Sequence, residues 1–363
     1  MLTTEGCRAR QQRLFAEMAG RRLDLFVSGN FRTVYYFTGR LAQPDAPCAF
    51  LAWADGETAL VAPAAERGLA GIKREVAVYA PERAVSLPHG DAAVMVKDLL
   101  AGRPAGRVGL DRTSVESTAV RDIAGEEASG LVLQLRRRKE ADEVDEIRTS
   151  LRLCAVAYDA ARQAIHPGET ELGVYLAMHA AIAQAYGEAV PFPGDFACGL
   201  RSVRGGGPAT DRVLAAGDLF PLDLFPAPAL YFGDTCRTFC AGEPTAGQHA
   251  SWKLVCDALA LGERLVRPGA RGADVYREIK AFLDDAELTA KSFWHHAGHG
   301  IGLHGHEAPR IIANTDDALE PGDVFTLEPG VYTDATQGGI RLENNYLVTA
   351  GGIEKLFDYP LEL

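Results

Sequence analysis

Five of the nine histidines in this chain lie in one short stretch, His295–Glu307, where four glycines separate them. Glycine allows the backbone to approach a partner closely. Two carboxylates precede the stretch, Asp223 and Asp234, and two follow it, Glu328 and Glu343. Imidazole together with several carboxylates suits Mn²⁺, Fe²⁺, Co²⁺ or Zn²⁺ acting on a water molecule. These segments therefore favour a metal site over the alternative, a solvated glycine-rich loop.

The segment between the two aspartates indicates how they could meet. Asp223 and Asp234 flank LFPAPALYFG, whose prolines cannot sit in a central strand pair, so we expect a hairpin tip near residues 228–229. The aspartates would then lie nearly opposite each other on paired strands, with Cβ atoms roughly 4.5–5.5 Å apart. Glu328 and Glu343 are predicted to pair in the same way.

Carboxylates held this close repel each other, and without a cation one of each pair would be forced to bind a proton. Two divalent ions about 3.5–4 Å apart, bridged by a carboxylate and a hydroxide, would remove the repulsion. The alternative is that the acids form surface ion pairs, Asp234 with Arg237 and Glu343 with Arg341. Acids that end apolar strands are mostly buried, and a buried charge needs a strong partner, so we favour the metal site.

The second part of the sequence repeats itself. Ile165–Tyr175 is echoed by Val266–Tyr276, and Gly217–Asp223 is echoed by Gly322–Glu328, in the same order. Two echoes in register predict a duplicated α+β unit. Its internal pseudo-twofold would bring the two carboxylate hairpins together.

Residues 1–135 are predicted to form a smaller α/β domain. A helix over Glu5–Arg21 precedes an apolar run at Leu23–Val27, and Asp55-Gly56 between two apolar runs indicates a hairpin of Cys48–Trp53 and Thr58–Val61. Other expected elements are a loop and aromatic strand over Asn30–Gly39, a helix over Asp91–Leu100, and strands at Val76–Tyr79, Val108–Leu110 and Leu131–Leu133.

The basic run Arg136–Lys139 marks the expected boundary, which gives domains of 1–135 and 136–363. Helical spacing of apolar residues predicts the helices that follow. The first carries Ile147, Leu151, Cys154 and Tyr158, and the second, with Thr170 as its N-cap, carries Leu172, Leu176 and Ile182.

Composition narrows the functional class. The chain has 363 residues and a formal net charge of −12, which argues against a general nucleic-acid binder. No apolar run reaches membrane-spanning length, and the N-terminal segment lacks an apolar signal core. Seven cysteines are an odd number for a disulfide framework, so we expect reduced thiols and a cytoplasmic protein.

The acidic and histidine motifs together resemble those of the aminopeptidase P/prolidase/creatinase family. The resemblance covers nearly the whole chain, and it includes Asn30–Gly39, which is similar to a segment of that family's N-terminal domain. It implies a C-terminal catalytic domain with the pita-bread fold after a creatinase-type α/β domain. The positions that match the family's five metal ligands are Asp223, Asp234, His299, Glu328 and Glu343.

The resemblance also implies roles. Asp234 and Glu343 would bridge two metal ions, with Mn²⁺ as our first choice and Co²⁺, Zn²⁺ or Fe²⁺ as alternatives. A metal-activated hydroxide would attack an amide carbon. His306 would stabilise the oxyanion and Glu328 would carry the proton to the leaving nitrogen. The other residues matching substrate-side positions are His295, Arg341 and Tyr231.

The chain departs from this family at several positions. The segment Gly205–Gly207 stands where the family has a histidine, and Phe225 where it usually has a glycine. His296 and Asn344 also differ from the common pattern. We therefore predict a wider pocket beside the glycines, weak activity on ordinary Xaa-Pro dipeptides and better use of a bulkier, less polar amide.

The function predicted from the sequence is a dinuclear-metal hydrolase resembling Xaa-Pro dipeptidase or aminopeptidase. We expect a homodimer acting on a small peptide or amide, with no nucleic-acid or membrane partner. One alternative is a hydrolase of the same fold that acts on a non-peptide amide or amidine, as creatinase and ectoine hydrolase do. Another is a pseudoenzyme that binds a partner through its pocket, against which the complete ligand set argues.

Overall fold

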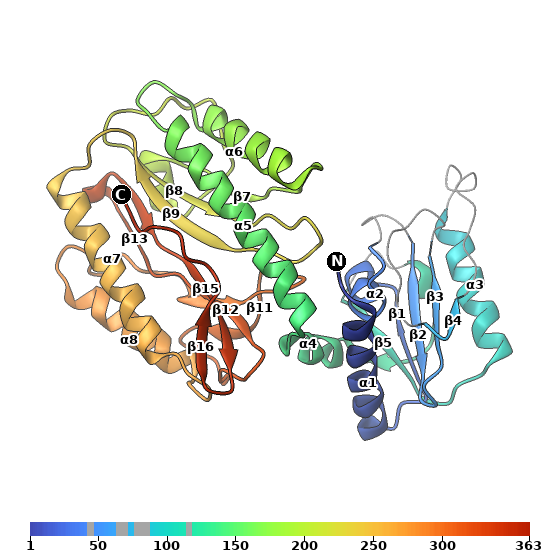
Figure 1. Cartoon of the computed structure of the whole chain (residues 1–363). Coiled ribbons are helices and arrows are strands. Elements are labelled where there is room, and N and C mark those ends of the chain that lie inside the picture. The colour runs from blue at the N-terminus through green and yellow to red at the C-terminus, as the bar shows by residue number, and fades with distance from the viewer. Residues whose placement is uncertain (42–46, 63–71, 76–87, 114–117) are drawn as a thin grey trace. The chain divides into compact units, whose positions relative to one another are not determined.

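The structure, a computed structural model, describes the whole chain except residues 42–46, 63–71, 76–87 and 114–117 (Figure 1). The chain divides into two compact units. The N-terminal unit comprises Met1–Arg136 and Glu140–Asp142, and the C-terminal unit comprises Arg137–Lys139 and Glu143–Leu363.

The N-terminal unit is built on a six-stranded sheet with the order β4-β3-β2-β1-β5-β6. Strands β1, β2 and β3 pair antiparallel, whereas β4, β5 and β6 each pair parallel to a neighbour. The elements are α1 (Thr4–Arg21), β1 (Leu25–Ser28), α2 (Phe31–Thr38), β2 (Ala49–Trp53), β3 (Thr58–Val61), β4 (Arg74–Glu75), α3 (Pro88–Gly102), β5 (Val108–Asp111), the short 3₁₀ helix η2 (Thr118–Val120), β6 (Glu126–Glu127) and α4 (Ser129–Arg137).

Successive side chains of a strand point to opposite faces, and helices pack against both faces of this sheet. On one face, Leu25 and Val27 pack with Val96 of α3. On the other face, the ring of Phe37 from α2 stacks on Phe50 with centroids 5.1 Å apart. The core of the unit is therefore divided into two layers by the sheet.

The strand predicted within Asn30–Gly39 is wrong, because this segment forms helix α2. The side chain of Asn30 caps it by accepting from the amide of Arg32, and Gly39 ends it in the left-handed conformation with φ of 64°. Aromatic residues favour strands only as a packing preference. Here both helix caps and burial of the aromatic rings outweigh that preference.

The strand predicted at Leu131–Leu133 is also wrong, since these residues belong to α4. A short apolar run cannot distinguish a strand from a buried helix. Leu131 and Leu135, four residues apart, are buried, whereas Leu133 is exposed, which is the helical pattern. The expected strand at Val76–Tyr79 lies outside the described residues.

The C-terminal unit contains three sheets, with the orders β7-β8-β9, β11-β10-β12-β15-β16 and β13-β14. The α5–α6 pair and the α7–α8 pair flank the strands (Figure 1). The elements are α5 (Ala141–Ala164), which begins in the N-terminal unit, α6 (Glu171–Tyr186), β7 (Gly194–Asp195), η3 (Gly199–Arg204), β8 (Leu219–Leu224), β9 (Thr235–Cys240), α7 (Ala246–Leu265), α8 (Gly272–Asp285), β10 (Gly298–Gly300), β11 (Glu307–Ile311), β12 (Val324–Leu327), β13 (Gly330–Thr333), η4 (Asp334–Thr336), β14 (Gly338–Arg341), β15 (Asn344–Thr349) and β16 (Gly352–Lys355).

The two sequence echoes occupy equivalent places in this unit. Thr170, the N-cap of α6, forms an isolated bridge with Val213, and Arg271, the N-cap of α8, forms the same kind of bridge with Ala318. The Gly-Asp turns before β8 and β12 both have their glycine at positive φ, 85° at Gly217 and 98° at Gly322. The predicted duplication is therefore visible in the structure.

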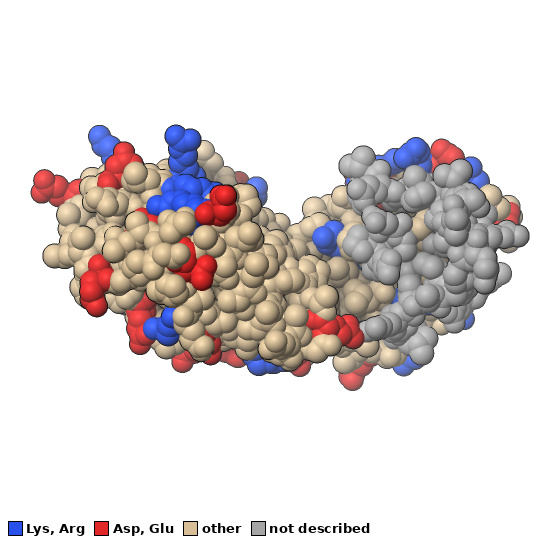
Figure 2. Space-filling model, turned by 90° about the horizontal axis from the view of Figure 1, so that it is seen from above, with Lys and Arg blue, Asp and Glu red and all other residues tan. Residues whose placement is uncertain are grey.

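Other features of the chain agree with its composition. All seven cysteines are free thiols. Among the helices that the structure describes, none is both long and apolar enough to cross a membrane. On the face shown in Figure 2, basic side chains of the C-terminal unit lie in small groups beside acidic ones. On that face, the described residues of the C-terminal unit form no continuous basic area of the kind that phosphate contacts need.

Candidate metal centre

Five side chains from different strands of the C-terminal unit converge on one buried place. β8 carries Asp223, Asp234 directly precedes β9, and β10 carries His299. Glu328 directly follows β12, and Glu343 lies between β14 and β15. All five are buried, with at most 7% of their surface exposed. The duplicated half-domains thus bring acids and an imidazole together in the interior.

The ligand-capable atoms of Asp234, His299 and Glu343 all lie within 4.8 Å of one another. Nε2 of His299 is 3.1 Å from Oε1 of Glu328 and 3.6 Å from Oδ2 of Asp234. Nδ1 of His299 lies 3.1 Å from the carbonyl oxygen of Gly300, which can only accept, so Nδ1 carries a proton. Nε2 of His299 therefore faces carboxylate oxygens, and either a proton on this nitrogen or a cation must lie between them.

Strand register places the glutamates as predicted but not the aspartates. Leu327 pairs with Asn344 and Gly330 pairs with Arg341, so Glu328 and Glu343 face each other between these pairs. In the other hairpin, Asp223 pairs with Cys236.

Asp234 is therefore displaced by two residues from the position opposite Asp223, and that prediction is wrong. The hairpin turns one residue later than the prolines suggested, around Ala229 and Leu230, where Leu230 has a φ of 66°.

The surface ion pairs considered as an alternative do not form among the described residues. Arg237 donates to backbone oxygens, including that of Glu343 at 2.7 Å, and to the side chain of Asn344. Arg341 donates instead to Oδ2 of Asp223 at 2.5 Å and to Oδ2 of Asp195 at 3.3 Å. Asp234 and Glu343 thus have no ion pair with these arginines.

The acids of this cluster are electrostatically unsatisfied. Oδ1 of Asp223 and both carboxylate oxygens of Glu343 are buried without a hydrogen-bond partner. Burial, and then the neighbouring carboxylates, raise the pKa of Asp234 and of Glu343 well above the ordinary range. Burial also raises the pKa of Asp223 to about 6, although Arg341 opposes this shift. Buried oxygens with no partner fit a site that holds cations.

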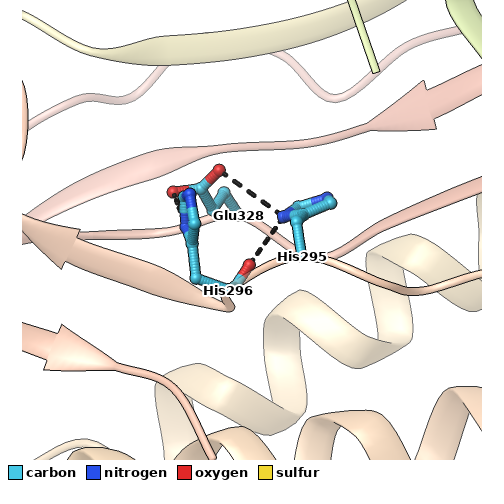
Figure 3. Close-up of side chains that lie close together, drawn as sticks. All are labelled: His295, His296 and Glu328. Atoms are coloured by element: carbon cyan, nitrogen blue, oxygen red, sulfur yellow. Dashed lines mark hydrogen bonds and ion pairs between the residues drawn. The ribbon is translucent and has the colours of Figure 1, made fainter. Parts of the chain in front are cut away.

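Glu328 connects this cluster to a second group, His295 and His296 (Figure 3). Nδ1 of His296 is 3.1 Å from Oε1 of Glu328, and Nδ1 of His295 is 4.0 Å from Oε2. Burial alone would raise the pKa of Glu328, but His296 and His299 hold it well below its usual range. The same contact raises the pKa of His296, in spite of its burial.

His295 is held as a neutral imidazole in one orientation. Its Nδ1 lies 2.7 Å from the carbonyl oxygen of His296, so this nitrogen donates, and Nε2 accepts from the hydroxyl of Tyr332 at 3.1 Å. Burial lowers the pKa of His295 to about 4. A neutral, oriented imidazole at neutral pH is suited to contacting a substrate.

His306 lies at an exposed position beside the candidate metal ligands. Its ring centroid is 3.9 Å from that of His299 and 5.3 Å from that of His296. Burial of part of its ring, and then these two imidazoles, lower its pKa to about 4. His306 is thus neutral at pH 7 and its exposed edge can reach a ligand.

Tyr231 and Phe225 lie in the loop between β8 and β9. The buried hydroxyl of Tyr231 donates to Oε1 of Glu143 at 2.9 Å, so it is engaged outside the cluster. Phe225 is half-buried, and its amide donates to the carbonyl of Pro193. The structure thus gives Tyr231 a partner within the protein rather than an open face.

Side chains from elsewhere lie beside Gly205–Gly207, and the predicted width of the pocket there stays a prediction. A Cβ on Gly205 would lie 2.8 Å from Cη2 of Trp294, and one on Gly206 would overlap the carboxyl group of Asp195. Gly205 also has a φ of 101°, which disfavours any other residue. Two side chains from elsewhere occupy the space that the missing side chain leaves.

Sequence analysis did not identify Asp195, Trp294 or Tyr332. Asp195 pairs with Asp223 in the register of β7 and β8, so both carboxylates point to the same face. Trp294 directly precedes His295 and is 55% exposed. Only its position next to a candidate site residue could have suggested Trp294, and no motif marks Asp195.

Comparison with known proteins identifies the family of the chain. A model of metallopeptidase family M24 matches residues 145–350. The chain is 28% identical to the probable dipeptidase PepE of Mycobacterium tuberculosis over 348 residues, 93% of this chain and 91% of that protein. It is 29% identical to the Xaa-Pro dipeptidase of Pyrococcus furiosus over 233 residues, 64% of this chain and 66% of that protein.

Solved structures resemble the whole chain. The prolidase from Pyrococcus horikoshii superposes with a TM-score of 0.81 at 22% identity, covering 98% of this chain and 99% of that one. The dipeptidase PepE from Mycobacterium ulcerans gives a TM-score of 0.78 at 25% identity, covering 100% of this chain and 98% of that one. These likenesses confirm the predicted pita-bread fold with its preceding α/β domain.

Proposed function

The chain belongs to metallopeptidase family M24, and from this premise we propose that it hydrolyses a small peptide of the Xaa-Pro type with two divalent metal ions. The family supports a divalent-metal peptidase, and the relatives named Xaa-Pro dipeptidase and dipeptidase support the substrate class. The observation that carries the proposal is the set of buried carboxylate oxygens without partners at Asp223 and Glu343.

We assign the ions to the converging side chains. Asp234, His299 and Glu343, whose ligand atoms lie together, would hold the ions along with Asp223 and Glu328. The lone pair of His299 Nε2 is already oriented by the bond from Nδ1 to Gly300. A carboxylate-rich set with one imidazole suits Mn²⁺, and Co²⁺, Zn²⁺ and Fe²⁺ are the alternatives.

When bound, such a pair of ions supplies hydroxide at neutral pH from a shared water. The protein's own groups would do the rest. His306, neutral at pH 7 and exposed beside His299, can donate an N–H to the oxygen that becomes negative during attack. His295, fixed by Tyr332, would contact the substrate. Glu328, next to both histidine groups, would carry a proton to the leaving nitrogen.

Arg341 has a supporting role in this proposal. Its buried guanidinium donates to Asp223, so it fixes the rotamer of that carboxylate while leaving Oδ1 free for an ion. We place the catalytic domain at residues 136–363, close to the C-terminal unit of the structure. The homodimeric state and cytoplasmic location stay predictions from the sequence.

A second candidate is hydrolysis of a non-peptide amide or amidine on the same fold. The observation that favours it is the changed wall at Gly205–Gly207, where Trp294 and Asp195 stand in place of a side chain from the loop. A panel of Xaa-Pro dipeptides, longer Xaa-Pro peptides and small amides separates the two candidates. Hydrolysis of small amides without cleavage of any peptide would favour the second.

The direct test is metal-dependent hydrolysis. Protein freed of metal by a chelator is reloaded with Mn²⁺, Co²⁺ or Zn²⁺ and assayed on Xaa-Pro dipeptides. We expect activity to appear on reloading and to disappear again with the chelator. Failure to bind any of the three ions would contradict the proposal.

A further inference from the structure

Asp195 has features of a group that faces a ligand. It lies opposite Asp223 in the β7–β8 pair, so the two carboxylates share one face of the sheet. Its side chain is 34% exposed, unlike the buried acids of the metal cluster. Oδ1 accepts from the amide of Gly207 at 3.0 Å, and Oδ2 from Arg341 at 3.3 Å. A carboxylate has about four acceptor sites, so Asp195 retains capacity on its exposed side.

Charge at this place is not balanced. Arg341 is shared between Asp195 and Asp223 and is closer to Asp223. If the proposed function holds, Asp195, the four carboxylates of the candidate metal centre, Arg341, two divalent ions and one hydroxide sum to about one negative charge when the histidines are neutral. Arg201, whose guanidinium would lie 3.6 Å from a Cβ on Gly207, is already paired with Glu171. A cationic group of the substrate would remove the remaining charge.

Trp294 supplies an aromatic ring beside the same glycine segment. Its ring lies against Gly205 and is 5.5 Å from the ring of His295 and 5.3 Å from that of Tyr332. A tryptophan that is 55% exposed beside buried candidate catalytic groups offers an aromatic face to a ligand. Indole faces attract ammonium and guanidinium groups more strongly than other aromatic side chains do.

The glycine segment explains why both side chains can stand here. Any side chain on Gly206 would displace the carboxylate of Asp195, and one on Gly205 would displace the indole of Trp294. The absence of side chains at these two glycines therefore allows Asp195 and Trp294 to occupy their positions. It also leaves the carboxylate of Asp195, a hydrogen-bond acceptor, at the wall of the site. We propose that Asp195 and Trp294 form a subsite for a cationic side chain of the substrate, the guanidinium of a residue next to the scissile amide.

This inference rests on the proposed function, and isosteric peptides test it. Metal-loaded enzyme is assayed on Arg-Pro against citrulline-Pro and on Ala-Arg against Ala-citrulline, since citrulline keeps the shape of arginine without its charge. We expect the arginine member of one pair to have a kcat/KM on the order of 10–100-fold higher, as for a hydrogen bond between charged groups. Asp195→Asn should bring that ratio close to one.

Controls separate this effect from general changes of charge. Asp211→Asn, which removes an exposed carboxylate after the glycine segment, should leave the ratio unchanged. A ratio near one in the unmodified enzyme, or one that survives Asp195→Asn, would overturn the inference and leave the proposed function standing. Preference for a glutamate-containing dipeptide would overturn it too, because Arg201 and Arg204 would then dominate.

If no peptide is cleaved, that result contradicts the proposed function but not this inference. A binding measurement then tests the inference by itself. Trp294 is the most exposed of the three tryptophans, so its fluorescence reports a ligand at this place. Acetyl-argininamide should quench it at a lower concentration than acetyl-citrullinamide, and Trp294→Leu should remove the signal. Equal quenching by both amides would overturn the inference.

Discussion

Two buried carboxylates, Asp142 in the N-terminal unit and Glu343 in the C-terminal unit, have opposite surroundings. Asp142 accepts from both terminal nitrogens of Arg10, at 2.8 and 3.2 Å, and from the amide and hydroxyl of Thr3. Glu343 has neither an ion pair with Arg341 nor a hydrogen bond to either oxygen. The protein alone satisfies the first carboxylate, whereas the second is arranged for something that the protein does not supply.

The pKa values of the two regions express the same difference. Burial would raise the pKa of Asp142, but Arg10 and Thr3 hold it below the ordinary value. Burial and neighbouring carboxylates raise the pKa of Glu343 well above it. Since folded proteins rarely leave buried charges unpaired, the contrast distinguishes an acid that stabilises the fold from one that we propose binds metal.

The largest effect on stability should come from the N-terminal unit, where Asp142 is paired with Arg10. Asp142→Asn removes the negative charge that faces the fully buried guanidinium of Arg10, so unfolding should require about 3–5 kcal/mol less. Denaturant unfolding followed by Trp53 fluorescence, in a background of Trp252→Phe and Trp294→Phe, measures this change in the N-terminal unit. The exposed pair of Asp122 with Lys97 gives a control, Asp122→Asn, expected to change stability by less than about 0.5 kcal/mol.

Within the binding region, His306 should separate catalysis from metal binding. His306→Ala removes a donor to the developing oxyanion, so kcat should fall on the order of 10²–10³-fold, about 2.7–4 kcal/mol. Metal content should stay unchanged, because His306 is exposed beside the cluster and is not among the converging ligands. Loss of metal in this variant would mean that His306 is itself a ligand.

The pH dependence of stability should have opposite signs in the two regions. In metal-free protein, Asp223 titrates at about 6 when folded and near 3.8 when unfolded, so the folded state binds more protons between these values. Stability should therefore fall as the pH rises through this window, by about 3 kcal/mol in total. Asp142, with its lowered pKa, contributes stability above its ordinary pKa and loses it as the pH falls.

Two variants measure these signs. Relative to the metal-free unmodified protein, Asp223→Asn should be near neutral at pH 4 and stabilising at pH 7. Asp142→Asn should be destabilising at pH 7 and less so in acid. A stabilising effect of Asp223→Asn that is independent of pH would show that repulsion among the acids is not its cause.

The residues proposed to bind metal were easier to select from the sequence than the elements that position them. Asp223, Glu328 and Glu343 end or follow apolar strands, and residue type and order were enough to select them. The register between Asp223 and Asp234 depends on where the hairpin turns, and that is set by Leu230 in the left-handed conformation rather than by the prolines.

Packing between distant segments could not be predicted from the sequence. The glycines at 205–207 suggested empty space, but Asp195 and Trp294 fill it from two other parts of the chain. Likewise, Asn30–Gly39 had the composition of a strand, and only the capping contacts of Asn30 and Gly39 show why it is a helix. Local patterns predicted the chemistry, whereas tertiary contacts determined its surroundings.

The most direct test of the account is the metal content of matched variants. Unmodified protein, Glu343→Gln and His306→Ala are loaded with Mn²⁺, dialysed and analysed by elemental mass spectrometry, with Asp142→Asn as the variant of the paired region. We predict about two ions per chain in the unmodified protein, in His306→Ala and in folded Asp142→Asn, and fewer than one in Glu343→Gln. Two ions retained by Glu343→Gln, or none bound by the unmodified protein, would contradict the claim that the unpaired carboxylates hold metal.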